Sequence, residues 1–502
     1  MFDRSKILNQ RVLKAEVLLS FFYFAVLLLL SYYVFFNLLG ERTLHIWDES
    51  RNAASAVEMQ VDGNVLSPSF NGEPDMWNTK PPLLIATQAL FVKMFGISEN
   101  SVRLPSAIAA LAAVLVIFFF VSRYTKSTSA GFLSALVLIT SPELLVYHGV
   151  RSADFEAFLM LFSIAYSLLI FAFVETGRKR FLYLGISCFV LAFFSKSTAS
   201  LLFIPGILIY VLLTGELSRI LRNKKVYFAV LASLVILLTY YLSREYLNAG
   251  YIKAVIQNEF GARAFDSLES HEEVWYFYIK TLWENGFKAW YSIIFIGLGV
   301  LYFEKSDKIK KLFVYCLTLV LSHLVLISIF KTKLIWYVIP EFPFWSILTA
   351  LSVIMIIRLG LRLIKNELAY KLLPVIIILL LVSAPTIRTL KTVKIVSLEE
   401  KSQKSIKLFL RDEFVKYHEL TDSKVKFISS DLKQNTCFYV LRLLELGYLI
   451  EYSGPDNICS GDIVLLNKKE KLSAIISTTM LADTILIYNE EILAYRILDV
   501  NK

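Results

Sequence analysis

Carboxylates and cations stand beside several strongly apolar segments of this sequence. The stretch HIWDESRNAASAVEM begins at His45 and places Asp48, Glu49 and Arg51 directly after a long apolar run. Ionisable side chains next to such segments are costly unless they pair with one another or face a polar cavity. The ends of the apolar segments are therefore where chemistry is expected.

Asp48 has two interpretations. The run DESRNAASAVEMQ is rich in alanine and is followed by Asp62 and Gly63, so it predicts a short helix along a membrane surface with Asp48 as its N-cap. Aspartate at a helix start is commonly no more than a cap. A carboxylate can also act as a general base, and both roles stay open for Asp48.

Lys80 lies in the stretch WNTKPPLL, between the predicted helix and the next apolar run. Pro81 disfavours helical backbone at Lys80, and Pro82 can begin the next helix, so Lys80 is expected on extended backbone at the interface. The ordinary explanation is a flanking lysine that extends its side chain to the interface.

A second group of ionisable residues occurs in YHGVRSADFEAFLMLF, where Arg151, Asp154 and Glu156 precede an apolar run. One explanation is an ion pair between Arg151 and Asp154 that caps the helix, and the other is a role in a site. Further polar residues return beside later apolar runs, namely Lys196 in AFFSKSTAS, Arg263 and His271 in GARAFDSLESHEEVWYFY, and Lys331, Lys333 and Tyr337 in KTKLIWYVIPEFP.

A mixture of carboxylates and cations next to lipid suits a substrate that is itself a lipid with an anionic headgroup. If a sugar is carried on a polyprenyl phosphate, its transfer needs a carboxylate to take the proton of the acceptor hydroxyl and cations to stabilise the departing phosphate. The departing phosphate is a weak base, so this reaction needs no general acid.

The composition indicates which elements position these residues. The chain has 502 residues, 56% of them hydrophobic and 19% charged, and its mean hydropathy of +0.60 is too high for a soluble multidomain protein. We therefore expect an α-helical polytopic membrane protein. About eleven segments are candidates to cross a bilayer, namely 15–38, 104–121, 130–147, 155–174, 181–194, 201–214, 226–242, 289–303, 312–330, 334–357 and 372–384.

Basic residues between these segments predict the orientation. If every span is counted, the clusters that contain Arg4, Arg123, Arg178, Arg219, Lys305 and Arg358 all fall on one side, which the positive-inside rule assigns to the cytoplasm. The formal net charge of +10 is then mostly a topology signal and no evidence for nucleic-acid binding. We expect an inner (plasma) membrane protein with a cytoplasmic N-terminus and a periplasmic C-terminal domain.

The sequence divides into a transmembrane domain, 1–387, with interfacial helices in its first outer loop, 39–103, and an extracytoplasmic α/β domain, 388–502. In the second part KVKFISS, YLIEYSG, DIVLLN, TILIYN and ILAYRIL predict strands, and NTCFYVLRLLELG and KEKLSAIISTTML predict helices. Cys437 and Cys459 both lie there. They could pair in an oxidising periplasm, and two thiols are an equally open alternative.

Seven motifs resemble, in order and spacing, the membrane glycosyltransferases of the GT-C fold. The motifs are WDESR, KPPL, RLPSA, RSADFE, FFSKSTA, an arginine (Arg263) eight residues before a histidine (His271), and KTKLIWYVIPEFP. Within that fold the chain most resembles the 4-amino-4-deoxy-L-arabinose lipid A transferases and the dolichyl-phosphate-mannose protein mannosyltransferases. The resemblance covers residues 3–343 and, weakly, the outer domain.

The resemblance implies roles for individual residues. The family's acidic pair falls on Asp48 and Glu49, with Asp48 matching the general base, and its second acidic position falls on Asp154. Its phosphate ligands fall on Lys80, Arg263 and Tyr337. With the basic residues noted above, the expected donor-phosphate ligands are Lys80, Arg263, Tyr337, Lys331 and Lys333, supported by Arg51, Arg151, Lys196 and His271.

The chain departs from the family pattern in two places. Ser197 stands where many relatives have glycine after the lysine, and HEEVWYFY lacks the common proline. Both departures concern the geometry of loops more than the chemistry of the site.

The expected activity is transfer of a sugar, with inversion, from a polyprenyl-phosphate donor to a hydroxyl or phosphate of lipid A, a glycolipid, a glycan or a protein. A non-catalytic binding protein for lipid-linked sugars, or a flippase, would also need a basic cavity but would have little use for Asp48. A secondary transporter would show inverted repeats, which we do not find. The cations supply the charge that the reaction needs, so no cofactor is required, and a divalent metal held by Asp48, Glu49, Asp154 and His271 is the alternative.

Overall fold

The computed structural model describes residues 4–259, 273–284, 288–398, 406–428, 433–454, 457–467, 480–488 and 492–500. The chain forms two compact units, each built from segments that are distant in sequence. The helical unit comprises Met1–Asn37, Asp75–Leu84 and Ser106–Lys394. The mixed unit comprises Leu38–Pro74, Ile85–Pro105 and Ile395–Lys502.

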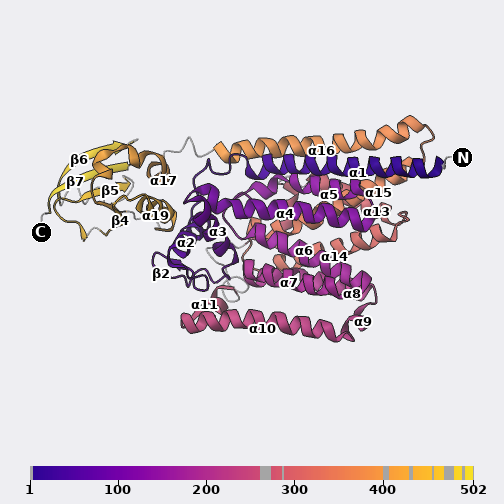
Figure 1. Ribbon diagram of the computed structural model, residues 1–502, viewed down its shortest axis with the longest axis horizontal. Coiled ribbons are helices and arrows are strands. Elements are labelled where there is room, and N and C mark those ends of the chain that lie inside the picture. Colours follow the sequence, from indigo (N-terminus) through magenta and orange to yellow (C-terminus); the bar gives the residue numbers. More distant parts are fainter. Residues whose placement is uncertain are drawn as a thin grey trace. The chain divides into compact units, whose positions relative to one another are not determined.

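Helices of different lengths make up the helical unit (Figure 1). They are α1 (Arg4–Ser31), most of α4 (Glu99–Thr125), α5 (Thr128–Ile139), α6 (Glu156–Thr176), α7 (Lys179–Lys196), α8 (Ile204–Leu213), α9 (Leu217–Leu221), α10 (Lys224–Leu247), α11 (Tyr251–Val255), α12 (Phe277–Glu284), α13 (Lys288–Leu301), α14 (Asp307–Ile329), α15 (Phe342–Leu361) and most of α16 (Glu367–Leu398). Short helical segments of 3-10 or π type lie between them, η1 (Tyr32–Phe36), η2 (Pro142–Leu145), η3 (Ser197–Phe203) and η6 (Ile335–Glu341). Helix α6 packs on α7, α8 on α14, and both α5 and α13 on α15.

Within the described residues, eight helical segments are long and apolar enough to cross a membrane. Each predicted span falls mainly on a helix of the structure. Helices α7 and α8, predicted as two spans, form one apolar segment from Lys179 to Leu213 because the turn η3 joins them. The spans predicted at 130–147 and 289–303 correspond to the shorter apolar helices Thr128–Ile139 and Ser292–Leu301. The multi-pass helical fold is confirmed, and the exact number of crossings stays a prediction.

The mixed unit joins the first loop to the C-terminal part of the chain. The loop contributes α2 (Asp48–Asp62), the hairpin β1 (Ser69–Phe70) and β2 (Glu73–Pro74), and most of α3 (Leu83–Phe95). The C-terminal part contributes α17 (Ile406–Leu408), α18 (His418–Thr421), α19 (Cys437–Glu445), β3 (Val425–Ile428), β4 (Ile450–Tyr452), β5 (Ile463–Asn467), β6 (Met480–Tyr488) and β7 (Ile492–Val500). Helix α19 packs against α2, so the first loop and the C-terminal part share one core.

The five C-terminal strands form one sheet in the order β4-β3-β5-β7-β6. Strand β3 runs parallel to β4 and β5, whereas β7 runs antiparallel to β5 and β6. Buried aliphatic residues of β3, β5 and β7 form its core, namely Ile428, Val464, Leu466, Leu493 and Ile497. The predicted strands and the helix in NTCFYVLRLLELG are therefore confirmed.

Two further expectations concern this C-terminal part. The predicted helix KEKLSAIISTTML lies mostly outside the described residues, and its last two residues, Met480 and Leu481, belong to β6 because they pair with β7. Its predicted end is therefore wrong. Cys437 is buried and Cys459 is exposed, and the two are not joined by a disulfide.

Helix α2 confirms the predicted surface-loop helix, with one correction at its start. The residue before the first helical turn is Trp47, whose φ is +66°, so Asp48 is the first helical residue and not the N-cap. The backbone N–H of Trp47 donates to Oδ1 of Asn435 at 3.0 Å, which fixes this entry. At the other end Gly63 takes φ +72° and its N–H donates to the Met59 carbonyl at 2.9 Å, the left-handed end that glycine favours.

Candidate active site

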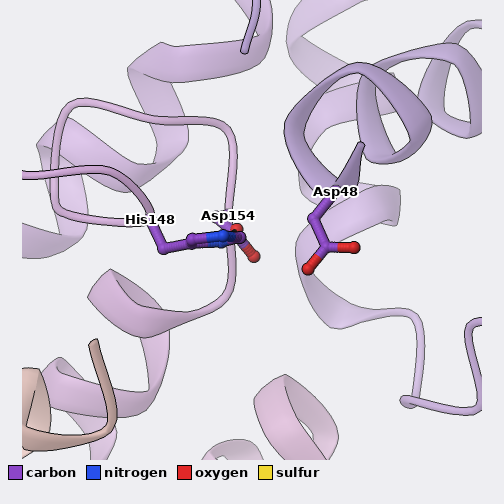
Figure 2. Close-up of side chains that lie close together, drawn as sticks. All are labelled: Asp48, His148 and Asp154. Atoms are coloured by element: carbon purple, nitrogen blue, oxygen red, sulfur yellow. The ribbon is translucent and has the colours of Figure 1, made fainter. Parts of the chain in front are cut away.

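The loop between α5 and α6 holds the predicted acidic residue Asp154. The imidazole Nδ1 of His148 contacts Oδ2 of Asp154, and both side chains are buried. Figure 2 shows the ring directed at the carboxylate. The other carboxylate oxygen accepts the backbone N–H of Phe155 at 2.7 Å. Asp154 is therefore held through both oxygens.

Gly149 makes this loop possible. A Cβ at Gly149 would lie 2.2 Å from the Leu144 carbonyl oxygen and 2.6 Å from that of Val146, so a larger residue does not fit. The preceding residue, His148, takes φ +62°, which is uncommon for a residue with a Cβ and is found where the surrounding structure imposes it. The tight turn thus directs the imidazole toward Asp154.

The electrostatics favour an ionised Asp154. Burial by itself favours the neutral acid, but the imidazole of His148, the ammonium of Lys196 and the Phe155 amide together lower the pKa of Asp154 below its usual value. His148 in turn packs on Trp336, with ring centroids 3.8 Å apart. A buried, oriented carboxylate results, and it can stabilise positive charge or accept a hydrogen bond from a substrate.

The predicted ion pair between Arg151 and Asp154 is wrong, because each residue makes another contact. Arg151 donates to the carbonyl oxygens of Val34 at 2.8 Å and Asn37 at 2.7 Å, where η1 ends the first helix. Backbone carbonyls at a helix end lack partners within the helix. Arg151 therefore secures that end of the chain, and the ion pair of Asp154 is with His148.

Lys196 lies at the end of α7 and forms a buried ion pair with Glu156, the first residue of α6. Its ammonium also lies 5.4 Å from the centroid of the Tyr337 ring. A cation over an aromatic face is favourable. The structure thus brings two of the predicted residues, Lys196 and Tyr337, together.

Ser197 follows Lys196 with φ +48° and ψ −131°. This conformation is strained for a residue with a Cβ and natural for glycine, the residue that the family resemblance gives at this position. The Ser197 hydroxyl pairs with the Tyr241 hydroxyl at 3.1 Å. Ser197 therefore adopts the backbone conformation that glycine would adopt, and its side chain adds strain.

A cavity of about 290 Å³ opens beside Lys196 and Tyr337. Its wall is mostly apolar and carries a few polar groups. The lining residues are Leu159, Lys196, Thr198, Ala199, Leu201, Leu202, Glu259, His323, Ile327, Phe330, Trp336, Tyr337 and Pro340. An apolar cavity with few convergent polar groups is typical of a ligand site, and this one would suit an apolar chain that ends in an anion.

His323 is a further polar residue of this cavity, and no motif in the sequence singled it out. Its Nδ1 lies 2.5 Å from Oε1 of Glu341, whose other oxygen accepts the Trp345 indole N–H at 2.9 Å. The ring stacks on Phe203 with a centroid distance of 4.5 Å. With Nδ1 engaged by Glu341, His323 is held in one orientation in the cavity wall.

The segment that carries Lys80 belongs to the same unit and is held in place by polar contacts. Arg244 donates to the Asp75 carbonyl at 3.1 Å, and the Tyr251 hydroxyl donates to the Thr79 carbonyl at 2.9 Å. The Thr79 hydroxyl donates to Glu259, a cavity residue, at 3.2 Å. Lys80 is therefore fixed on non-helical backbone, as the prolines predicted.

The ammonium of Lys80 lies 4.9 Å from the ring centroid of Phe155, the residue next to Asp154. Cation, carboxylate and cavity residues thus come from distant parts of the helical unit.

The remaining predicted lysines do not line the cavity. Lys333 donates to the Phe330 carbonyl at 2.7 Å at the end of α14, and Lys331 is exposed. Neither is among the described residues that line the cavity, and Arg263 and His271 lie outside the described residues.

Asp48, Glu49 and Arg51 lie in the mixed unit. Asp48 is exposed in the first turn of α2 (Figure 2). Glu49 is buried and accepts two hydrogen bonds from Arg103, at 2.7 and 3.1 Å, and the His45 amide at 2.6 Å. Arg51 donates to Gln434 at 3.3 Å and lies 4.1 Å from the Phe70 ring centroid. Of the three, only Asp48 presents an exposed carboxylate.

The role of Glu49 follows from its partner. Burial favours the neutral acid, but the guanidinium of Arg103 lowers the pKa of Glu49 to about 2. Arg103 also donates to the carbonyl oxygens of Leu39, Arg42 and Thr43, so this ion pair organises the chain before α2. Glu49 therefore has a structural role, and its partner Arg103 is the arginine of the motif RLPSA.

Known proteins resemble this chain in sequence and in fold. Residues 79–242 match the model of the family described as dolichyl-phosphate-mannose-protein mannosyltransferase. An uncharacterised protein of Aquifex aeolicus is 26% identical over 325 residues, which cover 63% of this chain and 61% of that protein. The undecaprenyl phosphate-alpha-4-amino-4-deoxy-L-arabinose arabinosyl transferase of Aeromonas hydrophila is 24% identical over 340 residues, 66% of this chain and 60% of that protein. The chain thus spans about 60% of the length of these two relatives.

The fold matches over nearly the whole chain. The crystal structure of ArnT from Cupriavidus metallidurans bound to undecaprenyl phosphate superposes with a TM-score of 0.71 at 15% identity, covering 94% of this chain and 97% of that one. The predicted GT-C fold is confirmed, as is the sequence resemblance to mannosyl and aminoarabinosyl transferases. The chain is a multi-pass membrane protein.

Proposed function

We propose that this chain, with its GT-C fold, is an integral-membrane glycosyltransferase that moves a sugar from a polyprenyl phosphate to a hydroxyl or phosphate acceptor. The acceptor classes considered are lipid A, another glycolipid, a glycan and a protein. The observation that carries the proposal is the cavity of about 290 Å³, whose mostly apolar wall carries a few polar groups, Lys196, Tyr337 and His323 among them.

The cavity would take the phosphate end of the donor and the first part of its apolar chain. Lys196, balanced by Glu156, and Lys80 would stabilise the negative charge that grows on the phosphate as the glycosyl bond breaks. The hydroxyl of Tyr337 would donate a hydrogen bond to the same group. The departing polyprenyl phosphate then needs no proton.

The new bond would form between the anomeric carbon of the sugar and the acceptor oxygen, with inversion, and the acceptor proton would pass to the carboxylate of Asp48. Asp154, held by His148, would orient the sugar or stabilise its positive charge. Glu49 takes no part in this scheme because Arg103 already occupies both of its oxygens.

The test uses the purified full chain in lipid nanodiscs with a radiolabelled polyprenyl-phosphate sugar. Lys80→Ala and Tyr337→Phe should weaken donor use, by roughly 1.5–3 kcal/mol for a charged bond and about 1 kcal/mol for the hydroxyl. Lys331→Ala, an exposed lysine that does not line the cavity, should leave donor use unchanged. Equal donor kinetics in all three variants would refute the assignment of Lys80 and Tyr337 as donor contacts.

The alternative is a binding protein or flippase for lipid-linked sugars. A protein of either class would bind the same donor, but it would release no polyprenyl phosphate when candidate acceptors are added. Detection of labelled sugar on an acceptor, with stoichiometric release of the lipid phosphate, therefore separates the two classes.

The proposal also places the reaction at the periplasmic face of the inner membrane, with the N-terminus in the cytoplasm. Accessibility tags at Asp62 and Ser460 should then be labelled from the periplasm, and tags at Ser218 and Lys308 only from the cytoplasm. The opposite pattern at either pair would contradict the orientation and with it the proposed site.

A further inference from the structure

A second cavity, of about 450 Å³, lies within the helical unit. Residues of η2, α12, η6 and α16 surround it, and Trp336 lines both this cavity and the smaller one. We call it the Glu143 cavity after its carboxylate. Its lining residues are Pro142, Glu143, Val146, Tyr147, Thr281, Leu282, Ile335, Trp336, Val338, Ile339, Phe342, Arg388 and Thr392.

Glu143 is the unexplained residue of this cavity. It is only 8% exposed, and neither of its carboxylate oxygens receives a hydrogen bond from another described side chain. Most buried polar groups in proteins have partners, and a buried carboxyl without one lowers stability. A buried carboxyl that lines a cavity in this way points to a polar group of a ligand as its partner.

Opposing effects act on the pKa of Glu143. Burial raises the pKa of Glu143 to about 7, although its own backbone amide and the guanidinium of Arg388 both act to lower it. Burial therefore favours the carboxylic acid form of Glu143 more than it would be favoured in water. The carboxyl group can accept a hydrogen bond in one form and donate one in the other.

The remaining lining residues narrow the chemistry of a ligand. Arg388 would repel a second cation beside Glu143, and an ionised Glu143 would repel an anion. Hydroxyl groups suit both forms of the carboxyl, and Thr281 and Thr392 add hydroxyl groups to the lining. The aliphatic and aromatic residues of η6 and α12 form an apolar wall, which suits a hydrocarbon chain and the face of a sugar ring.

We propose that the Glu143 cavity binds the hydroxyl-bearing head of an uncharged amphiphile, a sugar or polyol attached to an apolar chain. If the proposed function is correct, this molecule is the acceptor or a close analogue of it, and Trp336 separates it from the donor. The binding site itself does not depend on that function.

The test uses dicyclohexylcarbodiimide, which reacts with protonated carboxyl groups in apolar surroundings. The full chain in lipid nanodiscs is labelled at neutral pH, and modification of Glu143 is measured by peptide mass spectrometry. Octyl β-glucoside, octyl sulfate and octyltrimethylammonium, all with the same chain and below their micelle concentrations, serve as probes. We expect octyl β-glucoside to slow labelling of Glu143 severalfold more than either charged probe.

Two variants show where the probe acts. Thr392→Trp should fill the cavity from α16 and abolish the protection by octyl β-glucoside. Glu143→Leu should raise the thermal midpoint, because it removes a buried carboxyl that receives no hydrogen bond from another described side chain. Glu304→Gln is the matched control. It changes a buried carboxylate that accepts the Ser306 amide at 2.8 Å and pairs with Arg358, so it should lower the midpoint and leave the protection unchanged.

Each other outcome overturns the proposal. Equal protection by all three probes would show that the octyl chain alone matters, and protection by a charged probe alone would exclude the hydroxyl class. A lower thermal midpoint in Glu143→Leu would show that the carboxyl is structural. Sugar transfer is read separately with the labelled donor, so absence of transfer with intact protection refutes the proposed function and not this site.

Discussion

The backbone amide of Trp47 donates a 3.0 Å hydrogen bond to the side-chain oxygen of Asn435. Residues 388 positions apart in the chain thereby fix the turn that leads into Asp48. The contact has neighbours on both sides, since the Leu44 amide donates to the Tyr439 hydroxyl at 2.9 Å and Arg51 donates to Gln434 at 3.3 Å. The C-terminal part of the chain thus positions the proposed base.

Asn435→Ala should therefore act on the chemical step. Loss of one hydrogen bond should lower kcat about tenfold through misorientation of Asp48, with the donor KM unchanged. Steady-state kinetics with the labelled donor measure both quantities. Asn457→Ala, in the same C-terminal part, is the control and should change neither. A rise in donor KM without a fall in kcat would contradict a positioning role for Asn435.

Glu49 and Arg103 should make the stability of the mixed unit depend on pH. The pKa of Glu49 is lowered from 4.5 to about 2 in the folded chain, so the pair contributes its full stability above pH 4.5 and loses it as the pH falls toward 2. Glu49→Gln should cost about 3–5 kcal/mol at pH 7, because Arg103 is left buried without its partner.

Thermal midpoints measured from pH 7 to pH 3.5 check this prediction. The difference between the wild-type chain and Glu49→Gln should shrink as the pH falls. Glu73→Gln, in the exposed strand β2, should show a small difference at every pH. A difference for Glu49→Gln that stays constant over the range would show that the ion pair does not titrate as described.

At position 197 we expect glycine to give a more stable protein than alanine, the reverse of the usual order within a helix. Its φ of +48° disfavours any side chain, so Ser197→Gly should be more stable than Ser197→Ala by about 1 kcal/mol. Both variants lose the bond to Tyr241, which removes that contribution from the comparison. At Ser195, inside α7, the order should be the ordinary one, with alanine better by about 1 kcal/mol. Melting curves of the four variants measure these differences. Equal stability of the two Ser197 variants would show that the backbone at Ser197 is not strained.

Sugar transfer should survive removal of divalent metals. Of the four residues predicted as a metal set, Glu49 is engaged by Arg103, and Lys80 and Lys196 can supply the positive charge that the phosphate needs. Dialysis against EDTA should leave the turnover of the purified chain unchanged. Loss of turnover that Mg²⁺ or Mn²⁺ restores would establish a metal requirement and reassign these carboxylates.

The sequence was informative wherever local rules decide the structure. Proline fixed the backbone at Lys80, glycine ended α2 at Gly63, and alternating apolar residues predicted the C-terminal strands. It was uninformative about partners. His148 was missed because nothing local shows that a left-handed residue before Gly149 directs its ring at Asp154. Arg103 was quoted only as part of a motif, because its pairing with Glu49, 54 positions away, depends on tertiary contacts.

Asp48 is the residue on which the proposed chemistry depends most directly. It is the first helical residue of α2, after the capping residue Trp47, and its carboxylate is exposed. Asp48→Asn keeps the size of the side chain and removes only the favourable interaction of its charge with the helix dipole, about 0.3–1 kcal/mol. The thermal midpoint should therefore change little.

An amide cannot accept the proton of the acceptor, so Asp48→Asn should lower transfer by roughly 10² to 10⁴, the usual contribution of a general base, while binding of polyprenyl phosphate persists. Asp62→Asn, at the far end of the same helix, is the matched control and should transfer sugar at the wild-type rate. If Asp48 served only the helix, Asp48→Asn would stay active and Asp48→Ala would lose stability. Turnover and melting temperature of the three variants, measured side by side, separate these roles, and an active Asp48→Asn enzyme would end the case for catalysis at this position.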